Sequence, residues 1–83
     1  MFINRTSDGR NNIVGVKVAE LRKSQGKLFS QRALADKLND IGLDIDKNAV
    51  QRIESGQRFV TDIELGFLAA ALGTSINDLL GVQ

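Results

Sequence analysis

Four neighbouring side chains in the middle of the sequence have the hydrogen-bonding chemistry to recognise a polar ligand: Lys47, Asn48, Gln51 and Arg52. Their spacing would place Asn48, Gln51 and Arg52 together on one face of a helix, with Lys47 at the edge of that face. Guanidinium and ammonium groups pair with guanine edges in the major groove of DNA, and side-chain amides pair with adenine edges. The same residues would also suit the solvent-exposed face of an ordinary helix, so this segment alone leaves both interpretations open.

A helix over residues 47–55 would position these side chains. Val50 and Ile53 lie on the opposite side of such a helix and supply the surface that packs on a core. Asp46 is a favourable N-cap, since its carboxylate can accept a backbone N–H of the first turn. Gly56 suits the left-handed conformation in which many helices end. The segment therefore predicts a short rod with one apolar face and one polar face.

Four further helices are predicted by the spacing of apolar residues and by helix-start signals in the rest of the chain. We expect them over about 14–25, 31–41, 62–72 and 76–80, with N-caps at Ser30 and Ser75 and a capping box at Thr61 and Glu64. The expected core residues outside the helix at 47–55 are Val14, Val18, Leu21, Leu34, Ala35, Leu38, Leu65, Leu68, Ala69, Leu72, Ile76, Leu79 and Leu80. The fold class is thus all-α, a five-helix bundle with short links.

Residues 1–12 lack this periodicity and are rich in Asn, Ser, Asp and Gly, which predicts a flexible N-terminal arm. Residues 13–83 are then expected to form a single domain, since a chain of 83 residues suffices for one core. Arg5 and Arg10 could reach a DNA groove from such an arm, although a disordered terminus is the more frequent outcome.

The composition argues against catalysis, metal binding and membrane insertion. The chain has no Cys and no His, so it lacks the best thiolate nucleophile, the most useful general base and the usual zinc ligands. We therefore predict no enzymatic activity, no metal and no cofactor. No stretch approaches the roughly 18 consecutive apolar residues of a membrane span, and no long apolar run marks a signal peptide, so a cytoplasmic location is expected.

Charge is unevenly distributed along the chain. All 11 basic residues and 7 of the 10 acidic residues lie in residues 1–58, which carry a net charge of +4, whereas residues 59–83 carry −3. A basic front and an acidic rear match the electrostatic footprint expected for a polyanion such as DNA. Ordinary variation of a protein surface would produce the same distribution, so charge alone does not decide the function.

A series of segments resembles the Xre/Cro-like phage-repressor family of helix-turn-helix proteins. "VGVKVAELRKSQG" is similar to the family's first helix, "SQRALADKL" to its second, and "NAVQRIESGQR" to its recognition helix and the loop that follows. "LAAALGTSINDLL" is similar to the closing pair of helices. The resemblance covers residues 14–80. It implies a lambda-repressor-like bundle that binds double-stranded DNA as a sequence-specific transcriptional regulator, and we favour a repressor. We expect a homodimer on DNA, because one module buries a modest area and two half-sites multiply the affinity.

The resemblance also implies which residues contact DNA. The family contacts backbone phosphates at the start of its second helix and in the loop after the recognition helix, and it contacts bases from the recognition helix. The implied DNA-binding residues of this chain are Ser30, Gln31, Lys47, Asn48, Gln51, Arg52, Gln57 and Arg58. Arg22 and Glu54 fall where the family has an ion pair between the first and third helices, which assigns them to structure rather than to recognition.

The chain departs from this family between its second and third helices. The turn of a typical helix-turn-helix takes about three or four residues, whereas seven residues separate Leu38 from Asp46. We expect a lengthened turn that Leu43 and Ile45 anchor in the core. The insertion leaves open the angle at which the third helix approaches DNA, because the acidic residues that it carries are unfavourable near phosphates.

Three apolar residues favour a second interpretation. Phe67 and Ala70 of the fourth helix, and Val16 of the first, would point outward where family members usually have polar side chains. They form a candidate self-association patch, unless the last helix covers Phe67 through Ile76 or Leu80. The alternative function is therefore a protein-interaction module, antitoxin-like or adaptor, that docks a protein partner through Phe67 and Val16.

Overall fold

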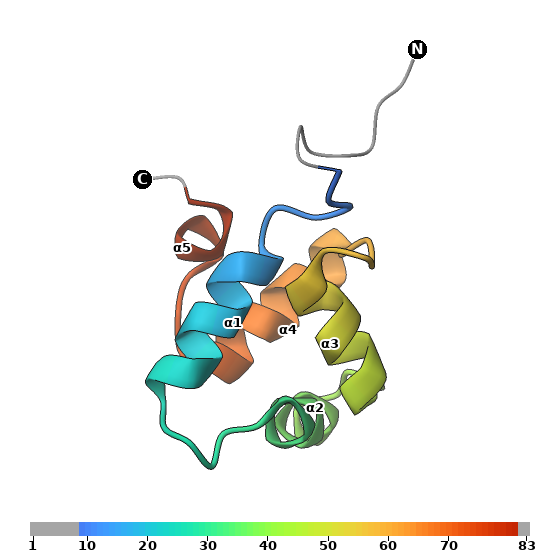
Figure 1. Ribbon diagram of the computed structural model, residues 1–83. Helices are drawn as coiled ribbons and strands as arrows, with labels where there is room; N and C mark the ends of the chain where they lie inside the picture. Colours follow the sequence, from blue (N-terminus) through green and yellow to red (C-terminus); the bar gives the residue numbers. More distant parts are fainter. Residues whose placement is uncertain (1–8, 82–83) are drawn as a thin grey trace.

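The computed structural model describes residues 9–81, which form five α-helices joined by short links (Figure 1). The helices are α1 (Gly15–Ser24), α2 (Gln31–Asp40), α3 (Lys47–Ser55), α4 (Asp62–Leu72) and α5 (Ile76–Leu80). The predicted all-α class and the order of five helices are confirmed, and residues 9–81 contain no strand. No helix in this range is long and apolar enough to cross a bilayer.

Side-chain caps begin four of the helices at the residues that the sequence indicated. Ser30, Asp46 and Ser75 each accept the backbone N–H three residues ahead, at 3.1, 2.8 and 3.0 Å. Thr61 and Glu64 form a complete capping box, in which each side chain accepts the backbone N–H of the other residue, at 3.2 and 3.0 Å. Each cap contributes about 1 kcal/mol. Together they determine where α2, α3, α4 and α5 begin.

The apolar core draws on all five helices. Helix α4 packs against α1, α2 and α5, while α3 packs against α1 and α2. The buried apolar residues are Val14, Val18, Leu34, Ala35, Leu38, Ile45, Val50, Ile53, Leu68, Ala69, Ala71, Leu72 and Leu79. The expectation that Ile76 belongs to this core is wrong, since its side chain is 42% exposed. Helix α5 has only five residues, and it buries chiefly Leu79.

The link between α2 and α3 is lengthened, as predicted, and is ordered by specific contacts. Gly42 adopts a positive φ of 113°, and the Leu43 N–H returns to the Leu38 carbonyl at 2.9 Å, which closes the end of α2. Ile45 is 7% exposed and anchors the link in the core. The Asn39 amide donates to the carbonyls of Ala35 at 2.8 Å and Ile45 at 2.6 Å. The inserted residues therefore hold α3 in a fixed position relative to α2.

Residues 10–12, which the sequence assigned to a flexible arm, are instead bonded to the C-terminal end of α3. The Asn11 N–H donates to the Gly56 carbonyl at 2.7 Å, and the Asn12 amide donates to the carbonyls of Ile53 at 3.0 Å and Arg58 at 2.8 Å. These carbonyls lie where a helix ends and lacks internal donors, which explains why polar residues bind there. The folded domain thus begins before residue 13. Residues 1–8 of the expected arm, which include Arg5, lie outside the described residues.

Candidate nucleic-acid interface

Helix α3 has one buried face and one open face. Val50 and Ile53 are fully buried. The residues predicted to read bases are all exposed; they are Lys47, Asn48, Gln51 and Arg52. The capped N-terminus and the left-handed Gly56, with φ of 84°, keep the helix short and well defined at both ends. The arrangement presents directed hydrogen-bond donors from a rod whose other face is fixed in the core.

The N-terminus of α2 lies beside α3, and the two helices pack at one edge of the molecule (Figure 1). Ser30 is exposed, and its Oγ is engaged as the N-cap acceptor, while the hydroxyl proton remains able to donate. Gln31, the first residue of α2, is half-buried and donates from Nε2 to Glu54 Oε1 at 3.0 Å. Helix N-termini attract anions through their backbone N–H groups and dipole. This end of α2 therefore suits a phosphate.

Arg22 and Glu54, which were expected to pair, form an ion pair between α1 and α3. Arg22 Nε lies 2.6 Å from Glu54 Oε2, and Arg22 Nη2 lies 3.1 Å from Oε1. The two side chains are 12% and 7% exposed. The hydrogen bond with Glu54 raises the pKa of Arg22 despite the opposing effect of burial. Arg22 also donates to the Phe29 carbonyl at 3.1 Å, which ties the segment leading into α2 to the same pair.

The loop after α3 contains the other two expected DNA contacts. Gln57 is exposed. Arg58 is only half exposed, because its Nη2 pairs with Glu64 Oε2 of α4 at 2.8 Å. A phosphate that reached this loop would share the Arg58 guanidinium with Glu64. The Gln57 side chain is thus open to solvent, whereas the Arg58 guanidinium is partly engaged by Glu64.

Replacing Glu64 by Gln is expected to make the fold less sensitive to acid. Burial alone would raise the pKa of Glu64, but hydrogen bonds from Arg58 and from Thr61 outweigh it and hold the pKa below the ordinary 4.5. A carboxyl with a lowered pKa stabilises the fold above its unfolded pKa, and this contribution is lost as pH falls through the folded pKa. Urea denaturation at neutral pH and at steps below pH 4.5 would show that the free energy of unfolding falls less in the variant than in the unmodified protein. An equal loss in both proteins would contradict this role.

One basic residue that the sequence interpretation did not include is a further candidate for contact with DNA. Arg32 is exposed on α2 beside Gln31, and it lines a shallow groove that reaches Lys47 at the start of α3. Asp36 and Asp46 line the same groove and limit its positive charge. In the sequence, the only indication that Arg32 could contact DNA was its position next to the first residue of α2. Because the turn between α2 and α3 is lengthened, the sequence did not show how close Arg32 and Lys47 would lie.

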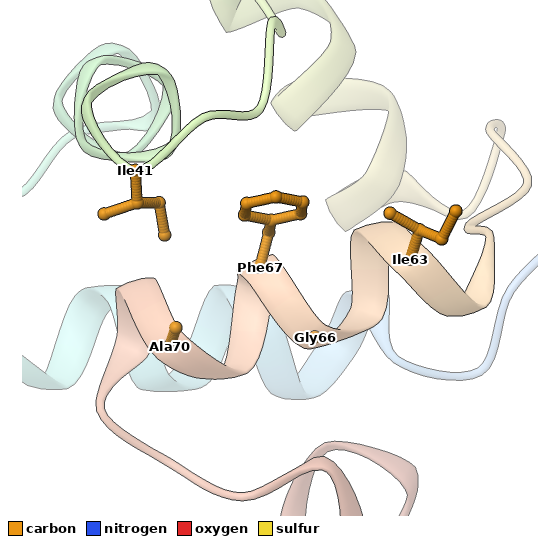
Figure 2. Close-up of a pocket in the computed structure, with 5 residues that line it drawn as sticks. All are labelled: Ile41, Ile63, Gly66, Phe67 and Ala70. Atoms are coloured by element: carbon orange, nitrogen blue, oxygen red, sulfur yellow. The ribbon is translucent and has the colours of Figure 1, made fainter.

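A separate apolar groove lies between α4 and the end of α2. Figure 2 shows its lining residues, which are Ile41, Ile63, Gly66, Phe67 and Ala70. Phe67 is half-buried because the α2–α3 link lies over its ring: a β-carbon on Gly42 would sit 3.6 Å from Phe67 Cε1. The link, rather than the last helix, therefore supplies this cover. Val16 is 52% exposed on α1 but does not line this groove.

The fold and the open face of α3 together define a class of protein. Two packed helices, the second of which displays exposed polar side chains, constitute a helix-turn-helix domain. A profile of the helix-turn-helix family matches residues 18–79, and the chain belongs to this family, in its Xre-like branch. No curated protein and no solved structure matches the chain. Membership of this family makes the chain a DNA-binding regulator.

Proposed function

We propose that this protein is a sequence-specific transcriptional repressor that inserts α3 into the major groove of its operator. The open face of α3 carries the proposal, because its donors are exposed while Val50 and Ile53 are fully buried behind them. Lys47 and Arg52 suit guanine edges, and side-chain amides such as that of Asn48 suit adenine edges. A domain that occupies a promoter in this way blocks transcription without any catalytic group.

Contacts with the DNA backbone would set the register of α3 in the groove. Ser30 and Gln31 lie at the N-terminus of α2, where a phosphate is favoured. Gln57 and Arg58 would contact phosphates from the loop after α3, and Arg32 is a further candidate from the open side of α2. Such contacts position a protein on the duplex without specifying sequence.

The proposed operator-bound form is a homodimer on an inverted repeat. A single small DNA-binding module buries about 600–1,000 Å² of protein surface, which is modest for tight specific binding. Two modules on half-sites about 34 Å apart place both recognition helices on the same side of the duplex. The dimer therefore supplies the affinity and specificity that one copy of α3 lacks.

Arg52→Ala is expected to relax the base preference at one position of each half-site. The exposed guanidinium is the strongest candidate for a bidentate guanine contact, and its loss costs about 1–3 kcal/mol at that position. Selection of duplexes from a random pool, followed by affinities at two salt concentrations, measures this effect. The matched control is Lys17→Ala, an equally basic exposed site on α1 that is outside the proposed interface. If Arg52→Ala lowered the affinity equally for all DNA sequences, base reading by Arg52 would be contradicted.

The apolar groove of Figure 2 favours a second candidate function, that of a protein-interaction module. Ile63 is 70% exposed and Ile41 is 43% exposed, so the groove offers apolar side chains to a partner. The two candidates respond differently to the same variants. In the second, Arg52→Ala and Asn48→Ala leave function intact, whereas Phe67→Asp abolishes it.

A further inference from the structure

Glu54 contacts more than its ionic partner. Its two carboxylate oxygens accept hydrogen bonds from Arg22 Nε at 2.6 Å, from Arg22 Nη2 at 3.1 Å and from Gln31 Nε2 at 3.0 Å. The Glu54 side chain is only 7% exposed. One buried carboxylate on α3 therefore contacts both α1 and Gln31, the first residue of α2. The proposed phosphate lies at this end of α2.

This contact fixes which way the Gln31 amide points. An amide nitrogen carries two hydrogens and no acceptor, whereas the amide oxygen is an acceptor only. With the amide reversed, the Gln31 oxygen would face the Glu54 carboxylate and two acceptors would oppose each other. The observed orientation commits one N–H to Glu54 and leaves the second N–H of the half-buried side chain for another acceptor.

We propose that Glu54 is a positioning residue for DNA binding, which acts by holding the Gln31 amide so that its second N–H donates to a backbone phosphate. This inference rests on the proposed function. Arg22 contributes to this arrangement in two ways. Its charge neutralises Glu54, so that the carboxylate does not repel the phosphate. It also donates to the Phe29 carbonyl at 3.1 Å, which fixes the segment that precedes Gln31. The ion pair between Arg22 and Glu54 thus holds the proposed phosphate-binding amide of Gln31 in place, in addition to joining α1 to α3.

A double-mutant cycle on DNA affinity tests the proposal. Glu54→Asp keeps the charge but shortens the side chain by about 1.5 Å, which breaks the contact with Gln31. We expect Gln31→Ala to weaken binding to the selected operator about tenfold, as the loss of a hydrogen bond to a charged group does. Glu54→Asp is expected to weaken binding several-fold in the unmodified chain and by less than about twofold in the Gln31→Ala background.

Two further readouts separate positioning from stability. Leu79→Val, a conservative truncation of a core residue in α5, lowers the melting temperature without touching this network and is expected to leave operator affinity unchanged. In the DNA-free protein, the side-chain amide ¹H–¹⁵N resonances of Gln31 are expected to move toward their unfolded positions in Glu54→Asp. A merely structural carboxylate would not shift them selectively.

The outcomes are distinguishable. The positioning role is overturned if Glu54→Asp weakens operator binding equally with Gln31 present and with Gln31→Ala. It is also overturned if Leu79→Val weakens operator binding as much as Glu54→Asp does at the same loss of melting temperature. In both cases the repressor proposal stands. If the unmodified chain binds no duplex in a salt-dependent manner, the proposed function and the positioning role both fail. Coupled losses with shifted Gln31 resonances establish the role of Glu54.

Discussion

Gly15→Ala is expected to cost about 3 kcal/mol of the free energy of unfolding. Gly15 opens α1 at the point where it meets the C-terminal end of α3. A β-carbon there would overlap the backbone oxygen of Ile53 and would lie 2.6 Å from Arg10 Nη2 and 2.9 Å from Asn12 Oδ1. A backbone oxygen cannot rotate aside as a side chain can. The two helices must therefore separate and strain the hydrogen bonds of residues 10–12.

Gly66→Ala is the matched control, and we expect the opposite sign. Gly66 lies in the interior of α4, a β-carbon added there meets no atom within 4 Å, and its φ is not positive. Alanine in such a helical site stabilises by about 0.5–1 kcal/mol, because it restricts the unfolded chain and favours the helix. Urea denaturation of the three proteins measures both changes. Equal effects of the two substitutions would show that close helix packing at Gly15 does not limit the fold.

The elements that were predicted correctly are those whose determinants are local in sequence. Ser30, Asp46, Thr61 and Ser75 are the observed caps, and α3 has the predicted bounds because an N-cap and a left-handed glycine enclose it. The open face of α3 followed from the positions of its two buried residues alone. The composition and the spacing of apolar residues were sufficient for the fold class because each helix buries one face against its neighbours.

The features that were missed depend on contacts between distant segments. Asn12 is 41 residues from Ile53 in the chain, so a polar residue in an Asn-rich stretch gave no signal that it would satisfy the end of α3. The cover of Phe67 by the link at Gly42 required knowing how an inserted turn folds back over α4. The hydrogen bond between Gln31 and Glu54 likewise joins residues of two different helices. Helical periodicity predicts contacts within one helix and not between two.

Glu54→Ala is expected to remove about 3–5 kcal/mol of stability, because it leaves the Arg22 guanidinium without its charged partner in a site where that side chain is only 12% exposed. A loss of this size is a large part of the total stability of a domain of 83 residues. Urea denaturation with a two-state analysis gives the value directly. A change below about 1 kcal/mol would place the pair among solvent-screened surface ion pairs instead.

A double replacement separates the two roles that Glu54 has in this structure. An apolar pair of similar volume often matches a buried ion pair in stability, so Arg22→Met combined with Glu54→Leu is expected to recover much of the loss seen in Glu54→Ala. The same protein has no carboxylate to hold the Gln31 amide and no donor from residue 22 for the Phe29 carbonyl. Recovered stability together with weak operator binding would therefore show that the charges at these two positions are retained for DNA recognition. If operator affinity returns along with stability, the pair contributes through the fold alone.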